Sequence, residues 1–495
     1  MTLSLTRRRF LGATAALAAG GLVHPGLVRP GHAAAPRVLT ATRRILEVGG
    51  RPASVYGLVG PDGAPGVVLD PGERFALSLA NRCGDPTIVH WHGQTPPPAE
   101  DGVTDTGYVG PLADGGDRAY DFAARPGTHW MHSHHGLQEQ VLMAAPFIVR
   151  TEEDLGLDAQ EVTVLLHDFT FRDPAEVLAQ LRGGMAMPMA GGAGMDHDAA
   201  PGSQDMAGMD HGAMGHGTME NGAMPGMDLN DIAFDAYLAN DRTLDDPQVI
   251  RAERGGRVRL RLINGATATA FWIDLGRLTA TVLAVDGNPV APVSGSRFPL
   301  AQAQRLDLLV TLPEPGAYPV LAQREGDRQR TGVVLATPGA AVPRLGPLAE
   351  APVGPVDMSL ERRLRAATPL AARPADVVHR VVLAGTMMPY AWSIDGRLWP
   401  DRAPVTVAAG QRARLEFVNG SAMAHPMHLH GHHFQVVEID GRAFSGALRD
   451  TVLVPPRGTV AVAFDCDNPG RWLLHCHNLY HMATGMMTEV IYAGA

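Results

Sequence analysis

A motif that occurs three times limits the possible folds of this chain more than any other feature of its sequence. The motif consists of Gly, any residue and Arg, followed by residues in a strand-like pattern that end in Asn. Its copies span residues 72–81, 255–264 and 410–419. A Pro-Gly pair shortly before an aromatic residue also recurs. These pairs begin at Pro126, Pro315 and Pro469. Three copies of both motifs predict three similar domains.

The composition predicts that these domains consist of strands. Short apolar and β-branched runs are separated by many of the 57 Gly and 39 Pro residues, which is typical of β-sandwiches. A length of 495 residues also exceeds one domain. We therefore predict an all-β fold of three sandwich domains. The predicted bounds are 36–150 for domain 1, 155–340 for domain 2 and 376–495 for domain 3, with a linker at 341–375.

The N-terminus predicts an export signal rather than a part of the fold. Three consecutive arginines at residues 7–9 precede an apolar run rich in Ala and Leu, and residues 33–35, all Ala, offer a cleavage site. We expect residues 1–35 to direct the protein to the periplasm by the twin-arginine route. No later apolar stretch reaches the length of a membrane span. A net charge of −10 argues against a nucleic-acid partner, and we expect a monomer.

Four His-x-His pairs are the strongest functional signal. Side chains two residues apart on a strand face the same way, so each pair presents two imidazoles to one side. The pairs are His90 with His92, His132 with His134, His428 with His430, and His475 with His477. Eight imidazoles are enough for three metal ions. Domain 2 carries Leu321 and Gln323 where the other Pro-Gly copies are followed by histidines. We therefore predict a three-metal cluster where domains 1 and 3 meet.

A second site is predicted on the opposite face of the last pair. Cys476 lies between the two histidines of that pair, so its thiolate points away from their imidazoles on an extended strand. An electron-transfer copper typically takes one cysteine, two histidines and an axial methionine, and Cys476, His481 and Met486 supply most of that set. His425 completes it.

With these four motifs the chain, from about Arg37 to its end, resembles the multicopper oxidases, the family of laccases, ascorbate oxidase and bacterial copper-efflux oxidases. The resemblance implies three cupredoxin-like Greek-key β-sandwich domains and four copper ions, one of type 1, one of type 2 and two of type 3. It also implies that electrons pass from Cys476 to His475 and His477 and reduce dioxygen to water.

The match to the family implies a ligand set for each copper. Type 1 takes His425, Cys476, His481 and Met486; type 2 takes His90 and His428; type 3 takes His92, His132 and His477 on one ion and His134, His430 and His475 on the other. Asp101 matches the family's acidic residue near the cluster that helps to deliver protons. Copper-efflux oxidases carry a second carboxylate directly after the last type 1 histidine, where this chain has Met482.

Residues 185–227 differ from the rest of the chain. They contain ten of the 21 Met residues and three His, and they follow neither a helical nor a strand period. Thioether and imidazole ligands select Cu(I), so we predict that this insertion collects cuprous ions. The alternative is a linker. The candidate ligands are Met206, Met209, His211, Met214, His216 and Met219.

Two reductants fit the sequence. The first is Cu(I), oxidised in periplasmic copper tolerance, and the second is a phenol or aromatic amine that meets the edge of His481, as in laccases. The Met-rich insertion favours Cu(I). Copper-efflux oxidases carry their insertion in domain 3, however, and they have an Asp where this chain has Ser421. Met387, Met388 and Met423 are candidates to replace that Asp. Oxidation of Mn(II) or Fe(II) and a non-catalytic copper-binding role are further alternatives.

The remaining cysteines and histidines receive structural interpretations. Cys83 and Cys466 either pair across domains or remain two buried thiols. The histidines that lie close to predicted ligands are expected to be solvated or to contact the ligands from outside. They are His129, His135, His432 and His433, and His167 is expected to be structural.

Overall fold

The computed structural model describes residues 37–183 and 229–494. The predicted export signal and the Met/His-rich insertion 185–227, with its six candidate ligands, lie outside the described residues. The chain divides into Met1–Pro36 and Arg37–Ala495, and the description below concerns the second unit. Among its described residues, no helix has both the length and the apolar character needed to cross a membrane.

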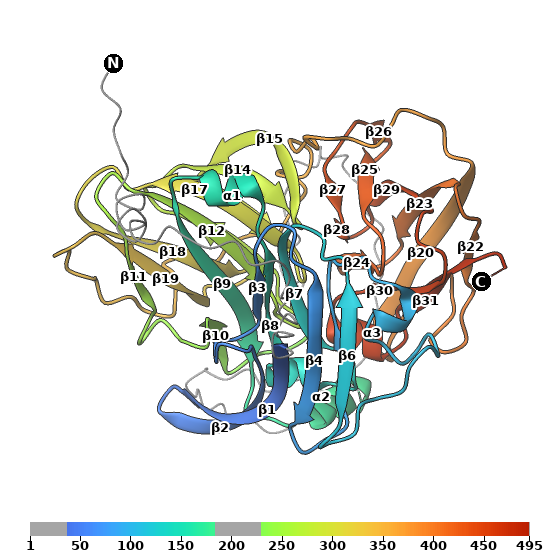
Figure 1. Ribbon diagram of the computed structural model, residues 1–495, viewed down its shortest axis with the longest axis horizontal. Coiled ribbons are helices and arrows are strands. Elements are labelled where there is room, and N and C mark those ends of the chain that lie inside the picture. The colour runs from blue at the N-terminus through green and yellow to red at the C-terminus, as the bar shows by residue number, and fades with distance from the viewer. Residues whose placement is uncertain (1–36, 184–228, 495) are drawn as a thin grey trace, which may run out of the picture. The chain divides into compact units, whose positions relative to one another are not determined.

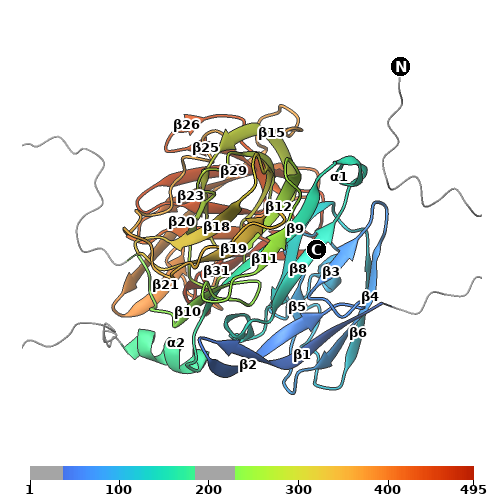
Figure 2. The ribbon, with the colours of Figure 1, turned by 90° about the vertical axis from the view of Figure 1, so that its left-hand side faces the viewer.

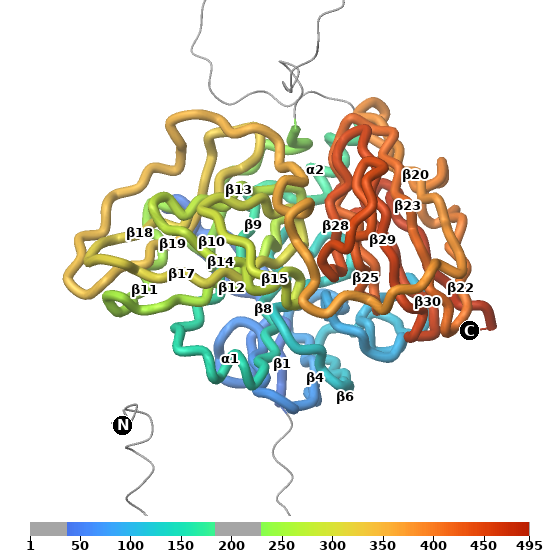
Figure 3. Tube along the Cα trace, turned by 90° about the horizontal axis from the view of Figure 1, so that it is seen from above, coloured from blue at the N-terminus to red at the C-terminus, as the bar shows by residue number. Residues whose placement is uncertain are grey.

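Three successive pairs of β-sheets confirm the predicted all-β fold. In Figure 1 the first pair runs from blue to teal, the second from green to yellow and the third from orange to red. Viewed from above, the second and third pairs lie side by side, and the first pair lies against both (Figure 3). The first and third pairs therefore meet although they are separated by a whole domain in the sequence.

The first pair has the strand orders β2-β1-β4-β6 and β3-β8-β7-β5. Phe75 packs against Trp91, Phe122 and Phe147 between these sheets, with ring centroids 4.6 to 4.7 Å apart. The bounds are β1 Arg37–Val48, β2 Arg51–Val59, β3 Val67–Leu69, β4 Phe75–Arg82, β5 Val89–His90, β6 Asp117–Phe122, β7 Gly127–Ser133 and β8 Ala144–Val149.

The second pair has the orders β10-β9-β12-β17-β14-β15 and β11-β19-β18-β13-β16. Its strands are β9 Gln160–Phe169, β10 Ala236–Ala239, β11 Val249–Arg251, β12 Arg257–Asn264, β13 Phe271–Asp274, β14 Ala280–Val285, β15 Asn288–Gly295, β16 Arg297–Leu300, β17 Arg305–Thr311, β18 Ala317–Arg324 and β19 Arg330–Ala336.

The third pair has the orders β21-β20-β23-β29-β25-β26, with β27 beside β25, and β22-β31-β30-β24-β28. Its strands are β20 Val377–Met387, β21 Tyr390–Ile394, β22 Val405–Val407, β23 Arg412–Asn419, β24 His425–Leu429, β25 Phe434–Ile439, β26 Arg442–Ala443, β27 Leu448–Arg449, β28 Thr451–Val454, β29 Thr459–Asp465, β30 Arg471–Cys476 and β31 Met487–Tyr492.

The repeated Gly-x-Arg…Asn motif forms the same element in each pair. Its strands, β4, β12 and β23, run parallel to the first strand of their domain and antiparallel to a later one. The Asn that ends each copy of the motif is buried, and its side-chain oxygen accepts the backbone N–H of the residue two positions on, at 3.1, 3.1 and 2.8 Å. Its amide donates to a carbonyl that is distant in the chain, that of Leu112, Leu300 or Val454. The motif recurs because this Asn closes the same loop three times.

Short helices connect the sheets. They are α1 Glu152–Gly156, α2 Pro174–Gly183 and α3 Leu479–Ala483, with 3₁₀ helices at Pro98–Glu100 and Gln138–Val141. Figure 2 shows α2 next to β21 of the third pair. Between β19 and β20 the described chain forms no named strand. It bonds to both neighbouring domains, because Ala291 donates to the Arg365 carbonyl and Ala366 to the Gly446 carbonyl.

Candidate metal centre

One cysteine and two histidines of the predicted type 1 ligands come together in domain 3, and we call them the cysteine–histidine set. His425 lies on β24, Cys476 ends β30 and His481 lies in α3, and all three are fully buried. The two Nδ1 atoms are 3.2 Å apart, and they lie 3.6 and 3.7 Å from the Cys476 Sγ. The point equidistant from three such atoms is about 2 Å from each, which is the length of a metal–nitrogen bond. The three donors therefore fit one first-row metal ion.

Local hydrogen bonds explain why the fourth predicted ligand, Met486, also lies here. The Asn478 side chain accepts the N–H groups of Tyr480 and His481 and so caps α3. The Met486 N–H donates to the His481 carbonyl at 3.0 Å, and the Met486 carbonyl accepts from Cys476 at 3.1 Å. Met486 is fully buried. The loop from Cys476 to Met486 is therefore closed around the predicted ligands.

The outer nitrogens of both imidazoles have polar neighbours. His425 Nε2 lies 2.7 Å from the Ser421 hydroxyl, and His481 Nε2 lies 2.8 Å from Asp231 Oδ2. Tyr390 and Asn478 also donate to Asp231. Burial alone would raise the pKa of Asp231, but His481 and these hydrogen bonds hold it below its usual value. A carboxylate therefore covers His481 from domain 2, a contact that the sequence did not predict.

The eight paired histidines converge between the sheet β3-β8-β7-β5 and the sheet β22-β31-β30-β24-β28. All eight are buried. Histidines of the two domains stack on each other, His90 on His430 and His92 on His428, each with ring centroids 3.8 Å apart. The predicted meeting of the pairs from domains 1 and 3 is therefore present in the structure.

Histidines within each implied ligand set lie close together, and so do histidines of different sets. His90 Nε2 lies 3.4 Å from His428 Nε2, and His430 Nε2 lies 3.0 Å from His475 Nε2. Ring centroids are 5.0 to 5.7 Å apart within one set of three and 5.1 to 5.4 Å apart within the other. The sets are His92 with His132 and His477, and His134 with His430 and His475.

Four inward ring nitrogens of this group have no hydrogen-bond partner among the described residues. They are His92 Nδ1, His132 Nε2, His134 Nε2 and His477 Nε2. Burial lowers the pKa of His475 to about 3, and it holds the pKa values of His92, His134, His428, His430 and His477 well below the usual range. Neutral imidazoles with unpartnered buried nitrogens are the form that binds a metal ion.

The outer nitrogens are directed to protein oxygens. The Nδ1–H of His90, His428 and His475 donates to the backbone carbonyls of Asp101, Asp450 and Cys476 at 2.9, 2.9 and 3.0 Å. Such outer contacts orient metal-binding imidazoles. His92 has the opposite orientation, because its Nε2 faces Asp450 Oδ1 at 3.0 Å.

Two buried carboxylates contact these histidines directly. Asp101 accepts from His430 Nδ1 through Oδ2 at 2.8 Å, and its Oδ1 lies 3.3 Å from His90 Nδ1. Glu139, in the 3₁₀ helix Gln138–Val141, lies 2.8 Å from His132 Nδ1 and 3.9 Å from His477 Nδ1. Asp101 was predicted, but Glu139 and Asp450 were not, because neither belongs to a motif with a fixed spacing from the histidines.

The other histidines lie outside both donor sets. Both nitrogens of His432 have partners, the His430 carbonyl and the Tyr492 hydroxyl, and both nitrogens of His433 lie close to Gly93 and Asn288. His129 is buried and His135 is half-buried. His167 is buried in β9, with its Nδ1 donating to a backbone carbonyl.

The remaining cysteines do not form a disulfide. Cys83 lies in the core of the first pair of sheets and Cys466 in that of the third, and both are free and buried. Of the two alternatives, the structure contains the two buried thiols. Burial also raises the pKa of the Cys476 thiol, so a bound metal ion is needed to favour the thiolate.

Three cupredoxin-like sandwiches, one cysteine–histidine set and eight convergent histidines define a class of copper-binding oxidoreductases. Residues 43–154, 160–342 and 372–494 match three profiles that are each described as multicopper oxidase. The chain belongs to the multicopper oxidase family. Membership implies copper, and the donor sets fit it because imidazole and thiolate are preferred copper ligands.

Individual relatives agree with this assignment. The multicopper oxidase MmcO of Mycobacterium tuberculosis is 34% identical over 430 residues, which cover 85% of this chain and 80% of that protein. Copper resistance protein A of Pseudomonas syringae pv. tomato is 27% identical, with 98% of each chain covered. The laccase of Botrytis aclada has the same fold, with a TM-score of 0.71 over 92% of this chain and 87% of that chain at 21% identity.

Proposed function

We propose that this protein takes single electrons from a reductant at a type 1 copper and passes them to a three-copper cluster that reduces dioxygen to water, and that the reductant is Cu(I). The observation that carries the proposal is the arrangement of two donor sets around one tripeptide. Cys476 belongs to the cysteine–histidine set, while His475 and His477 belong to the eight-histidine set. Copper, when bound, supplies the one-electron redox chemistry at both sets.

In this proposal the predicted ligand sets hold four copper ions. His425, Cys476, His481 and Met486 hold type 1, and His90 and His428 hold type 2. The six remaining histidines hold the type 3 pair in the two sets of three described above. The covalent path from Cys476 to either neighbour is short, and a hydrogen bond from His475 Nδ1 to the Cys476 carbonyl at 3.0 Å adds to it.

Asp101 is proposed to handle protons for oxygen reduction. Its side chain is buried beside histidines of two different copper ions. Asp101 Oδ1 has no hydrogen-bond partner among the described residues, so this oxygen is available to a water molecule or to oxygen-derived groups. A buried carboxylate with one free oxygen at hydrogen-bonding range of the cluster suits a general acid or base.

The Cu(I) assignment is supported by the residues that flank the Met/His-rich segment 185–227. On its N-terminal side, Arg182 of α2 donates to the Ala483 carbonyl of α3 at 3.1 Å. On its C-terminal side, Asp231 lies 2.8 Å from His481 Nε2. The described chain on both sides of the segment thus contacts the helix that carries His481. This position of the flanking residues favours the segment as a source of cuprous ions for the type 1 site.

The laccase alternative is supported by the similarity to laccases but not by the surroundings of His481. This imidazole is 0% exposed. Asp231 lies beside its Nε2, and the Trp392 ring lies 4.0 Å from it. A phenol would have to displace these side chains to reach the imidazole edge. A metal ion needs only an electron path through Asp231, and a carboxylate is also a ligand for cations.

Oxygen uptake tests the choice of reductant. The copper-loaded protein would be assayed with Cu(I) and then with a simple phenol, and the same assays would be made after deletion of residues 185–227. A matched control keeps the length of the segment and replaces its ten Met and three His by Ser and Asn. We expect both changes to lower the rate with Cu(I) at low concentration and to leave the rate with phenol unchanged or higher. If Cu(I) turnover is the same in all three proteins, the segment is a linker and the laccase alternative is favoured.

Export is part of the proposal. We propose that residues 1–35 direct the folded chain to the periplasm by the twin-arginine route, where it acts as a monomer in copper tolerance. Replacement of Arg7 and Arg8 by Lys should keep the protein in the cytoplasm when cell fractions are analysed with an antibody. Unchanged export of that variant would contradict the assigned route.

A further inference from the structure

The orientation of His92 differs from that of the other seven clustered histidines. Those seven turn Nδ1 outward: five donate from it to protein oxygens, and two direct it to carboxylates 3.9 Å away. His92 Nε2–H instead donates to Asp450 Oδ1 at 3.0 Å, and its inward Nδ1 has no partner among the described residues. Some feature of the surroundings must therefore select this orientation.

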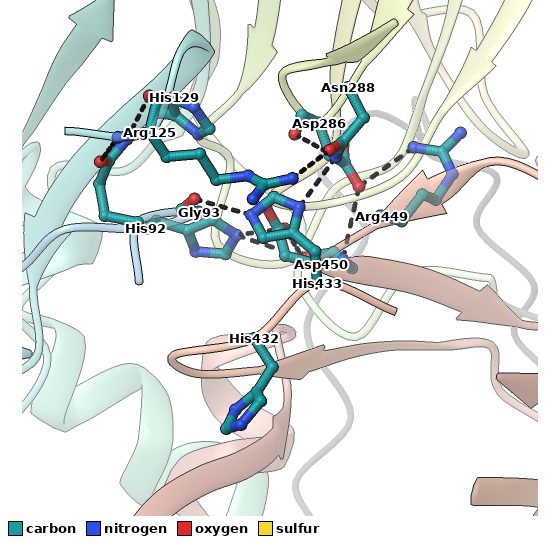
Figure 4. Close-up of polar contacts among 12 residues, drawn as sticks. His92, Gly93, Arg125, His129, Asp286, Asn288, His432, His433, Arg449 and Asp450 are labelled. Atoms are coloured by element: carbon teal, nitrogen blue, oxygen red, sulfur yellow. Dashed lines mark hydrogen bonds and ion pairs between the residues drawn. The ribbon is translucent and has the colours of Figure 1, made fainter. Parts of the chain in front are cut away.

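Asp450 lies beside His92 and His433 (Figure 4). An arginine of domain 2, Arg305, holds it in place. Arg305 Nη1 donates to Asp450 Oδ1 at 2.7 Å, and Arg305 Nη2 donates to Asp450 Oδ2. Since both carboxylate oxygens accept from the guanidinium, Asp450 is an acceptor for His92 and carries no proton to donate. The His92 nitrogen that faces Asp450 must then carry its hydrogen, which leaves the lone pair on the inward Nδ1.

Arg305 is itself held by groups from two domains. Its Nε donates to the Thr128 carbonyl of domain 1 at 3.2 Å, and its Nη1 donates to the Ala303 carbonyl at 3.0 Å. The carboxylate of Asp286 accepts the Arg305 backbone N–H at 2.9 Å. The side chain of Arg305 is 0% exposed. Through these bonds and Asp450, one guanidinium touches all three domains at the place where the cluster is assembled.

The packing around Gly93 leaves little room for another orientation of the His92 ring. Gly93, which follows His92, has a φ of +85°, and a Cβ there would lie 2.5 Å from Arg305 Nη2 and 2.8 Å from Asp450 Oδ2. The Gly93 carbonyl accepts from His433 Nε2 at 2.8 Å. The backbone beside His92 is therefore pressed against the Arg305–Asp450 pair, which sets both the position and the rotation of the His92 ring.

We propose that Arg305, which lies in the domain without copper ligands, is a positioning residue of the three-copper cluster. It orients Asp450, and Asp450 orients His92 with Nδ1 toward the metal. Without Arg305 the carboxylate would lose both of its bonds to the guanidinium, and the His92 ring could turn over or move away from its metal ion. This inference rests on the proposed function, because it assumes that the clustered histidines hold copper.

The test compares Arg305→Lys and Arg305→Met with Arg261→Lys. Arg261 is a suitable control because it is also buried in the same sheet and also contacts Thr128, but it forms its ion pairs with residues other than Asp450. For each protein we would measure copper per chain, the type 1 absorption, the EPR signal and the unfolding temperature without metal. EPR is informative because a coupled pair of Cu(II) ions gives no signal, whereas an isolated Cu(II) ion does.

We expect Arg305→Lys to weaken binding of the cluster copper by about 10- to 100-fold, or to give a new EPR signal from an uncoupled ion. Its type 1 absorption should be unchanged, because that site has its own ligands. Arg261→Lys should lower the unfolding temperature by about as much as Arg305→Lys does. Its copper content and EPR signal should be those of the wild type. Normal cluster copper and EPR in both Arg305 variants would overturn the inference, as would equal losses in the Arg261 control. A wild-type protein that binds no copper would refute the proposed function instead.

Discussion

Strands β7, β18 and β30 occupy equivalent places in three sheets, yet only β7 and β30 carry histidines. Each strand lies between two neighbours in the same order, β8-β7-β5, β19-β18-β13 and β31-β30-β24. All residues of β7 are buried, as are all but the first residue of β30. In β18 buried and half-buried residues alternate, and Leu321 and Gln323 lie on the half-buried side.

We infer from this difference that a histidine pair forms a metal site only where the sheet of a second domain packs against it. One His-x-His pair offers two ligands, and in the proposed cluster each copper ion takes its ligands from both domains. In domains 1 and 3 the two faces cover each other, so the imidazoles on both faces are buried away from water. In domain 2 Gln323 instead donates to two loop carbonyls at 2.8 and 2.9 Å. The equivalent strand therefore carries metal ligands in domains 1 and 3, where another domain packs against it. In domain 2 it carries a side chain that bonds to a loop.

The largest effect is expected from Cys476→Ser on β30. Because the thiolate is both a ligand and the start of the path to His475 and His477, type 1 absorption should disappear. Oxygen reduction should slow by more than about 100-fold, which is the largest loss expected when only a residue that hydrogen-bonds to a metal ligand is changed. Absorption, oxygen uptake and copper analysis check this result. Cys466→Ser is the control, since Cys466 is also buried and free. Retained turnover in Cys476→Ser would refute the proposed electron path.

A smaller effect is expected from Asp101→Asn, at the interface of domains 1 and 3. The amide can still accept a hydrogen bond from His430, but it cannot hold the proton, so oxygen reduction should slow by about 100-fold with the copper content unchanged. Rapid mixing of the reduced protein with dioxygen measures this step. Asp105→Asn is the control, because Asp105 is 28% exposed and its Oδ2 lies 3.9 Å from His134 Nδ1. Identical oxygen kinetics in the Asp101 variant and the wild type would disprove the assigned role.

The next smaller effect is expected from Glu139→Gln, which changes a contact of the histidine on β7. Glu139 contacts His132 of domain 1 and lies near His477 of domain 3. Loss of its charge should weaken copper binding at one type 3 position by about tenfold. Competition with a copper chelator measures this change. Glu489→Gln is the control, since Glu489 is fully buried and paired with Arg402 and Arg471. Equal copper loss in both variants would mean that Glu139 acts only on overall stability.

The smallest effect is expected from the double variant Leu321→His with Gln323→His on β18. This change restores the His-x-His spacing in domain 2 without supplying a facing pair from another domain. Copper per chain should not rise, and the free energy of unfolding should change by no more than about 1 kcal/mol. Copper analysis and denaturant unfolding check both values. An additional copper ion bound with high affinity would show that the strand position alone is sufficient. It would contradict the conclusion that a histidine pair needs a facing domain.

The three-domain all-β fold and the convergence of the histidine pairs could both be predicted from the sequence. The loop-closing Asn marks one strand in each domain, and the two-residue period of a strand assigns neighbouring side chains to faces. Both signals are local, so they can be read before any packing is known. Counting from each Pro-Gly pair also identified domain 2 as the one that lacks the histidine pair at that position.

The side chains that surround these histidines could not be predicted, because they are brought there by the packing of the domains. Arg305 and Asp450 are 145 residues apart in the chain and come from different domains. Asp231 covers His481, and the two thiols of Cys83 and Cys466 remain separate in different cores. These contacts follow from how three sandwiches pack against one another. No local period or spacing in the sequence records that packing, because each contact joins residues that are far apart in the chain.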